Sequence, residues 1–222
     1  MRFLLALLFP IAASAEGVYQ TSYDDLFQEL AEIVDFENYD RFLSPGTKLD
    51  GIQDFGGVRG AERFFGQYVE QVDGFDRITG VPVFPLKLMP GRERENLAVT
   101  FYFMITNHLV GHAAPGYPEN RAGGEGSIAL LFDNEQRALG FIVAAEPRPK
   151  EDRPQSVMTV SFYSGDGRLI DRLNVPLAWG RKGYGFVREG NIPDIAGITI
   201  ENRDPAGIAI DDIIFDAVVP QS

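Results

Sequence analysis

Two adjacent carboxylates, Asp211 and Asp212, interrupt an otherwise apolar run, GIAIDDIIF. Neighbouring side chains on a β-strand point to opposite faces, so these two form no acid/base dyad unless a bulge intervenes. A charge within a strand that is apolar on both faces needs a partner. Calcium would meet that need, because it accepts a carboxylate oxygen and a backbone carbonyl from one short segment. The alternatives are an exposed rim position for one aspartate with an arginine partner for the other, or a catalytic role.

The only two histidines, His108 and His112, fall in a segment rich in Gly, Pro and charge, which predicts a long loop over 108–126. Their four-residue spacing would suit a transition metal on a helix, but Gly111 and Pro115 argue against a helix there. We therefore expect a solvated or ligand-facing loop. The sequence also lacks the motifs of zinc proteases, α/β-hydrolases, P-loop proteins and EF-hands. Whether the protein is an enzyme stays open, with a preference against it.

A second set of residues has the chemistry to bind a sugar. Aromatic faces hold pyranose rings, and nearby amide or guanidinium groups bond the hydroxyls. A single tryptophan in a β-sandwich packs in the core more often than it faces a ligand, although the glycine and basic residues that follow this one favour exposure. The candidates are Trp179 and Tyr184 in one glycine-flanked segment, and Tyr117, Asn120 and Arg121 in the long loop.

One helix is expected near the start of the chain, over residues 22–33. Ser22 is a candidate N-cap, and apolar residues from Leu26 to Ile33 recur at helical spacing. The rest of the chain alternates short apolar, β-rich runs with turn residues, which is typical of an antiparallel sandwich or barrel. The predicted strands are 33–36, 64–69, 97–105, 127–132, 138–144, 157–163, 168–175, 195–201 and 208–215, with hairpin turns at 133–137, 164–167 and 202–207. A second loop is expected over 146–155.

The first residues predict export. Arg2, an apolar run and Ala13-Ser14-Ala15 have the layout of a secretory signal peptide over residues 1–15, too short to span a bilayer. We divide the rest into an N-terminal helical extension, 16–33, and a sandwich domain, 34–222. The predicted location is periplasmic or extracellular, without membrane insertion. The chain has no cysteine, so core burial must stabilise it. Its net charge of −12 disfavours nucleic acid and anionic lipid as partners.

The segment from Val34 to Glu37 and the run that contains Asp211 resemble the two terminal strands of jelly-roll domains in exported bacterial proteins. These include the carbohydrate-binding-module-like domains of proteins with a PEP-CTERM sorting tail. Segment 124–143 is similar to the middle of such domains. The chain ends without the Pro-Glu-Pro tail, so sorting by that route is not expected. The resemblance implies an all-β, antiparallel jelly-roll sandwich, here with one short N-terminal helix.

In calcium-containing domains of that shape, an acidic residue on the first strand and an aspartate on the last share a structural calcium. The resemblance places this calcium at Glu37 and Asp211, with Asp35 and Asp212 as reserves. It implies a secreted, non-catalytic binding module for an extracellular glycan or matrix component. The alternatives are a structural or adhesion protein without a small ligand, and a jelly-roll glycan hydrolase or lyase with its acid and base in the 108–126 loop. The oligomeric state stays open.

Overall fold

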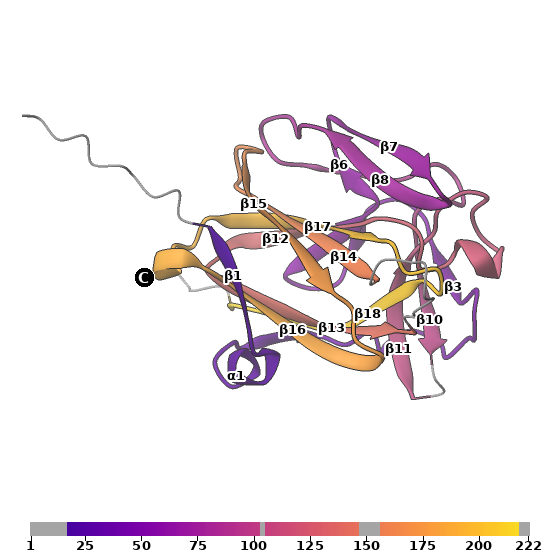
Figure 1. Ribbon diagram of the computed structural model, residues 1–222, viewed down its shortest axis with the longest axis horizontal. Helices are drawn as coiled ribbons and strands as arrows, with labels where there is room; N and C mark the ends of the chain where they lie inside the picture. The colour runs from indigo at the N-terminus through magenta and orange to yellow at the C-terminus, as the bar shows by residue number, and fades with distance from the viewer. Residues whose placement is uncertain (1–16, 103–104, 147–155, 218–222) are drawn as a thin grey trace, which may run out of the picture.

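Two antiparallel β-sheets pack face to face in this computed structural model, which describes residues 17–102, 105–146 and 156–217 (Figure 1). The fold is the all-β, antiparallel sandwich with one short N-terminal helix that the sequence predicts. The predicted signal peptide, residues 1–15, and most of the predicted 146–155 loop lie outside the described residues.

The strands of the two sheets are neighbours in the following orders. Sheet A runs β1 (Val18–Thr21), β16 (Gly180–Arg188), β13 (Ala138–Ala145), β18 (Ile208–Phe215), β11 (Thr106–Gly111), β10 (Leu97–Tyr102) and β3 (Thr47–Leu49), with β2 (Glu32–Val34) also beside β18. Sheet B runs β15 (Leu169–Pro176), β14 (Val157–Tyr163), β17 (Ile195–Asn202), β12 (Ile128–Gln136), β5 (Val58–Ala61) and β4 (Gln53–Asp54). Two short pairs lie outside these sheets: β6 (Arg63–Phe64) with β9 (Leu88–Met89), and β7 (Gln67–Val72) with β8 (Phe75–Gly80).

The chain crosses repeatedly between the two sheets. Strand β12 lies in sheet B and β13 in sheet A, and likewise β17 lies in sheet B and β18 in sheet A. Of the three predicted hairpins, only the one around turn 164–167 forms, because its two strands, β14 and β15, pair with each other. The hairpin predictions at 133–137 and 202–207 are wrong, and β12 in fact continues to Gln136. Turn residues show where the chain reverses but not which sheet receives the next strand, and crossing buries both apolar strands in one core.

Inward-facing side chains of both sheets form a single large core. Phe162 of sheet B packs on Phe186 of sheet A with ring centroids 5.3 Å apart, and Phe141 lies 5.6 Å from Phe186. Such distances are favourable for aromatic pairs. This burial stabilises a chain that has no disulfide.

The helix α1 spans only Tyr23–Phe27, shorter than the predicted 22–33. The predicted N-cap is confirmed, because the Ser22 hydroxyl accepts a hydrogen bond from the Asp25 N–H at 3.3 Å. The chain leaves the helix early since Glu32–Val34 pairs with β18. The helix covers sheet A over β16, where a Cβ on Gly183 would lie 2.6 Å from Tyr23. Among the described residues, no helix has the length and apolarity needed to cross a bilayer.

Three other element predictions need correction. The predicted strand 64–69 divides into β6 and β7, and 97–105 ends at Tyr102. The first part of the predicted 108–126 loop is strand β11, which pairs with β10. His108 therefore lies on a strand, with its side chain fully buried. The polar residues Asn107 and His108 hid the strand because their side chains are buried in the fold, where Asn107 Nδ2 donates to the Phe36 and Tyr39 carbonyls.

Candidate functional site

A β-bulge on β18 brings the two adjacent aspartates together. Opposite β13, Asp211 pairs with Ile142 while Ile214 pairs with Gly140, so Asp212 and its successor share one partner. Asp212 has a φ of 46°, a left-handed conformation that such bulges use. Both carboxylates consequently reach the same guanidinium, Arg181 Nη2, at 2.8 Å from Asp211 and 3.4 Å from Asp212.

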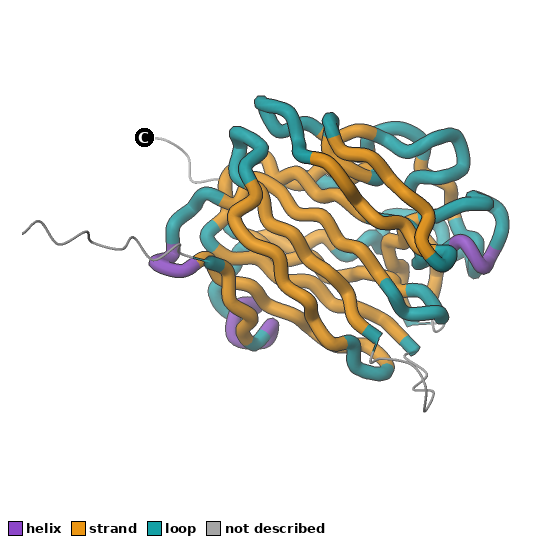
Figure 2. The backbone as a smooth tube through the Cα atoms, turned by 45° about the horizontal axis from the view of Figure 1, so that its top comes forward, coloured by secondary structure: helices purple, strands orange, loops and turns teal. Residues whose placement is uncertain are grey.

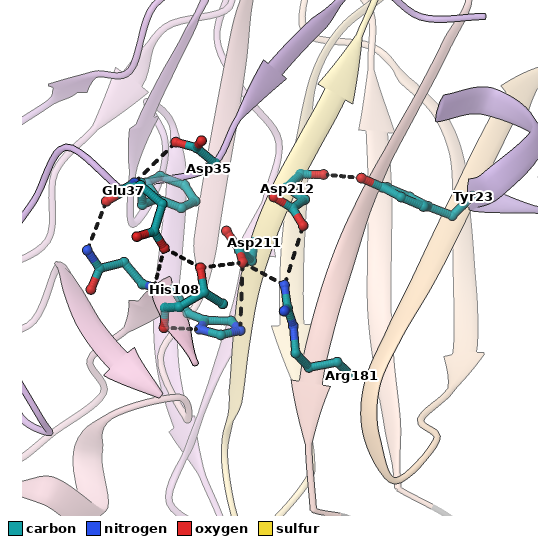
Figure 3. A network of polar contacts seen from close by, with 10 residues as sticks. Tyr23, Asp35, Glu37, His108, Arg181, Asp211 and Asp212 are labelled. Carbon is teal, nitrogen blue, oxygen red and sulfur yellow. Dashed lines mark hydrogen bonds and ion pairs between the residues drawn. The ribbon is translucent and has the colours of Figure 1, made fainter. Parts of the chain in front are cut away.

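A polar network extends from this bulge towards β2 (Figure 3). The Thr106 hydroxyl lies between Asp211, 3.4 Å away, and Glu37, which accepts its hydrogen bond. Glu37 also accepts the Asn107 N–H at 2.9 Å. The two hydrogen bonds, from Thr106 first, lower the pKa of Glu37 to about 2. The sequence-predicted pair Glu37 and Asp211 thus meets around one hydroxyl group.

Asp211 is fully buried, and this burial, followed by the nearby charge of Asp212, raises the pKa of its carboxyl to about 7. Its Oδ1 has no hydrogen-bond partner among the described residues. His108 Nε2 lies 3.9 Å from Asp211 Oδ2. Burial lowers the pKa of His108 to about 4, so the imidazole is neutral at pH 7 and adds no positive charge to the network.

Arg181 is the ion-pair partner of both aspartates, whereas the arginine alternative expected one aspartate to pair and the other to lie at an exposed rim. Asp35, the other reserve ligand, is exposed and accepts the Glu37 N–H at 3.1 Å. In the part of the chain that the structure describes, no three His, Asp or Glu side chains are grouped so that they could hold a metal ion. Calcium at Glu37 and Asp211 therefore stays a prediction, in which the ion competes with Arg181 for the same carboxylate oxygen.

The predicted sugar-binding residues separate into an exposed and a buried group. Trp179, in the loop between β15 and β16, is 74% exposed. Tyr184 is only 3% exposed, so its prediction as a ligand-binding residue is wrong. Its hydroxyl accepts the Ala178 N–H at 3.1 Å and donates to the Pro176 carbonyl at 3.3 Å. The sequence could not show which of these two aromatic residues is exposed. In the structure, the two hydrogen bonds of the Tyr184 hydroxyl stabilise the loop that carries Trp179.

The remaining predicted residues belong to the β11–β12 connection. The Tyr117 hydroxyl donates to the Gly46 carbonyl at 3.1 Å, and Asn120 Oδ1 accepts from Ser44 at 3.3 Å. His112 is buried against Tyr117, with ring centroids 5.7 Å apart. The side chain of Arg121 lies outside what the structure describes. Among the described residues, no hydrogen bond or ring contact joins Tyr117 or Asn120 to Trp179.

A groove that the sequence analysis missed lies on the outer face of sheet B. The β7–β8 hairpin crosses over this face (Figure 2). The groove between the hairpin and the sheet has a volume of about 1210 Å³. The Ile78 N–H of β8 donates to Glu201 of β17 at 2.8 Å, which fastens the hairpin to the sheet. Strand register places Asn174, Thr159 and Glu201 in one row across β15, β14 and β17. The groove is lined by these three residues and by Arg77, Arg172, Arg203, Asp76 and Glu125, among others.

The carboxyl groups of the groove differ in their pKa values and in their hydrogen-bond partners. Burial raises the pKa of Glu125 to about 8, and its Oε2 has no hydrogen-bond partner among the described residues. Burial also raises the pKa of Asp76 to about 6, although Asp76 accepts the Ser127 N–H at 2.9 Å. Burial raises the pKa of Glu201 against three arginine charges that lower it. At pH 7 the groove lining therefore contains a mostly neutral Glu125 and three exposed arginines.

The sequence contains no signal for the groove beyond the place of Glu125 within the predicted 108–126 loop, where it is a candidate only for the acid or base of a hydrolase or lyase. Polar residues that alternate with apolar ones, as in β14 and β15, are the ordinary pattern of an outward-facing strand surface. Only the position of the hairpin turns this surface into a groove.

No family model, curated protein or solved structure matches this chain. The resemblance of its terminal strands to exported carbohydrate-binding-type domains therefore stays a prediction.

Proposed function

We propose that this protein is an exported, non-catalytic module that binds an extracellular glycan in the groove beneath the β7–β8 hairpin. The observation that carries the proposal is the groove itself, about 1210 Å³ in volume and open on the outer face of sheet B. The lining side chains of Thr159, Arg172, Asn174 and Glu201 stand on paired strands, which hold them more rigidly than loops would. Rigid presentation reduces the entropy lost when a ligand binds.

The chemistry of the lining favours a hydroxyl-rich ligand. Arg172, Asn174 and Glu201 present planar groups that donate or accept hydrogen bonds in pairs, as adjacent sugar hydroxyls require. Arg172 is oriented by a 2.9 Å hydrogen bond from its Nε to Ser161. An apolar metabolite would leave these groups desolvated and unpaired, which is unfavourable.

Trp179 extends the proposed binding surface. The Leu177 N–H donates to the Ser156 carbonyl at 3.0 Å, and Ser156 lines the groove. Trp179 follows two residues later with 74% of its surface exposed, so its ring is available to stack on a sugar. The signal-like residues 1–15 and the acidic composition support an extracellular or periplasmic setting.

The proposal is tested by a glycan-array screen of residues 16–222, with and without calcium, followed by calorimetry with the ligand found. Asn174→Trp should fill the groove and weaken binding at least about 10-fold, equal to about 1.4 kcal/mol. Asn134→Trp, on an exposed part of β12 outside the groove, is the matched control. An array without a bound glycan, or equal affinity in both variants, overturns the proposal in favour of a structural or adhesion protein.

A further inference from the structure

The groove brings three arginines together with four acidic residues, on a chain that is acidic overall. The net charge of the protein is −12, yet three arginines line this one groove. Arg77 comes from β8, Arg172 from β15 and Arg203 from the residue after β17, and all three are exposed. Their convergence from three separate elements requires the folded arrangement of hairpin and sheet.

These three guanidinium groups have little carboxylate to neutralise them. Glu201 is the one group whose pKa all three lower, and its Oε1 already accepts the Ile78 N–H at 2.8 Å. Among the described residues, none of the three groove arginines forms an ion pair with a carboxylate, because every such pair uses a basic side chain outside the groove. Apart from Arg172 Nε, which donates to Ser161, the groove therefore offers guanidinium donors without a carboxylate partner among the described residues.

The other acids of the groove oppose an incoming anion to different degrees. Glu125 is 9% exposed and, with its pKa raised to about 8 by burial, is mostly neutral at pH 7. Asp76, with its pKa raised to about 6, is mostly ionised at pH 7, but it is buried and its carboxylate accepts the Ser127 N–H. Asp73, exposed at the hairpin turn, is the remaining acid of the lining.

We propose that the groove selects an anionic glycan, and that the carboxylate of a uronic acid residue pairs with Arg172 and its two neighbouring arginines. This inference rests on the proposed glycan-binding function. The planar guanidinium matches a carboxylate with two parallel hydrogen bonds, which a neutral hydroxyl does not reproduce. Sulfate esters carry the same charge on the same kind of polymer, so the experiment includes them as a separate probe.

The experiment compares three probes against the mature protein by calorimetry: a panel of uronic acid oligosaccharides, the same oligosaccharides with their carboxyl groups reduced to alcohols, and sulfated oligosaccharides. The best uronate should bind at least about 10-fold more tightly than its reduced counterpart. This preference should shrink as salt rises, because salt screens exposed charges. Arg172→Gln should remove most of the preference, and Arg172→Lys should keep part of it.

Arg168→Gln is the matched control, since Arg168 stands on the same hairpin at the turn outside the groove. Reduced oligosaccharides that bind as tightly as the uronates overturn the charge selection and leave the glycan function intact. Tighter binding of the sulfated probes overturns the carboxylate assignment. If none of the probes binds and the glycan array is also empty, both proposals fail together.

Discussion

The bulge network and the groove each contain a buried carboxyl with a raised pKa, but they differ in whether their charged groups have partners within the protein. At the bulge, Asp211 and Asp212 share Arg181, and Glu37 is held by Thr106 and a backbone N–H. The groove lining contains Glu125 and three arginines that have no carboxylate partner within ion-pair distance among the described residues. The first set pairs its charges internally, although Asp211 Oδ1 has no hydrogen-bond partner among the described residues, whereas the second leaves guanidinium groups without a carboxylate partner.

The difference teaches that acidic residues in apolar strands are a poor guide to a binding site. Buried charges must be paired before the protein folds stably, so they indicate internal partners first. Exposed charges on a rigid surface need no internal partner, and their unused hydrogen-bonding capacity is what recognises a ligand. We therefore expect substitutions at the bulge to change stability and substitutions in the groove to change affinity.

The largest effect is expected for Arg181→Met. This change leaves the buried Asp211 without its cation and should lower the free energy of unfolding by about 2 to 4 kcal/mol at pH 8. Urea unfolding measures this change. Arg41→Met, which removes the exposed ion pair with Glu37, should lose less than about 1 kcal/mol. Equal losses in the two variants would contradict a stabilising role for the bulge network, and neither variant should alter glycan affinity.

Calcium tests whether the bulge is also a metal site. An ion that binds only the folded state stabilises it by about 2.7 kcal/mol at one hundred times its dissociation constant. We expect the rise in Tm between chelator and millimolar calcium to be larger in Arg181→Met than in the wild type, because guanidinium and ion compete for Asp211. Asp211→Ala should abolish the response. Melting curves unaffected by calcium in the wild type and in Arg181→Met would remove the metal from these residues.

Glu125 should make the protein less stable at alkaline pH. Its pKa is raised from 4.5 to about 8 in the folded state, so folding retains a proton that the unfolded chain has released. The contribution of Glu125 to the stability of the protein is therefore fully present below pH 4.5 and is lost as the pH rises through 8. Between pH 7 and 9 the loss should be about 1.5 kcal/mol, to which Asp211, with its pKa of about 7, adds a small part.

Glu125→Gln should remove most of this loss, and the exposed Glu119→Gln should retain it. The two histidines do not interfere in this range. Burial lowers the pKa of His108 and His112 to about 4, so their contribution to stability is lost only as the pH falls below about 6.5. A Glu125→Gln variant with the wild-type pH profile would show that Glu125 is not the buried acid responsible.

The smallest effects are expected at the Trp179 loop, where Tyr184 contributes to stability and Trp179 to the proposed glycan binding. Tyr184→Phe removes the hydroxyl that holds Ala178 and Pro176 and should lower the free energy of unfolding by about 1 kcal/mol. Trp179→Ala should leave stability unchanged and weaken glycan binding by about 1 kcal/mol. Trp179 is the only tryptophan, so its fluorescence should be readily quenched by acrylamide. Blue-shifted, unquenchable emission would contradict its exposure and its role in binding.

The sequence by itself determined the class of fold and the unusual character of Asp211. Alternation of apolar residues with turns predicts strands because side chains point alternately to the two faces of a sheet, a local property. Carboxylates in an apolar strand predict a partner for the same kind of local reason, the unfavourable burial of an unpaired charge. Which partner would be found was open, and calcium and an arginine were both consistent with the pattern.

Tertiary structure decided the rest. Arg181 became the partner because β13 lies between β16 and β18, and because the bulge turns Asp212 towards the same guanidinium. The groove exists because the β7–β8 hairpin, far from β15 in the sequence, crosses over the outer face of sheet B. Side-chain periodicity is encoded within a few neighbouring residues, whereas sheet choice, register shifts and the convergence of arginines depend on contacts between distant segments, whose free energy no local pattern carries.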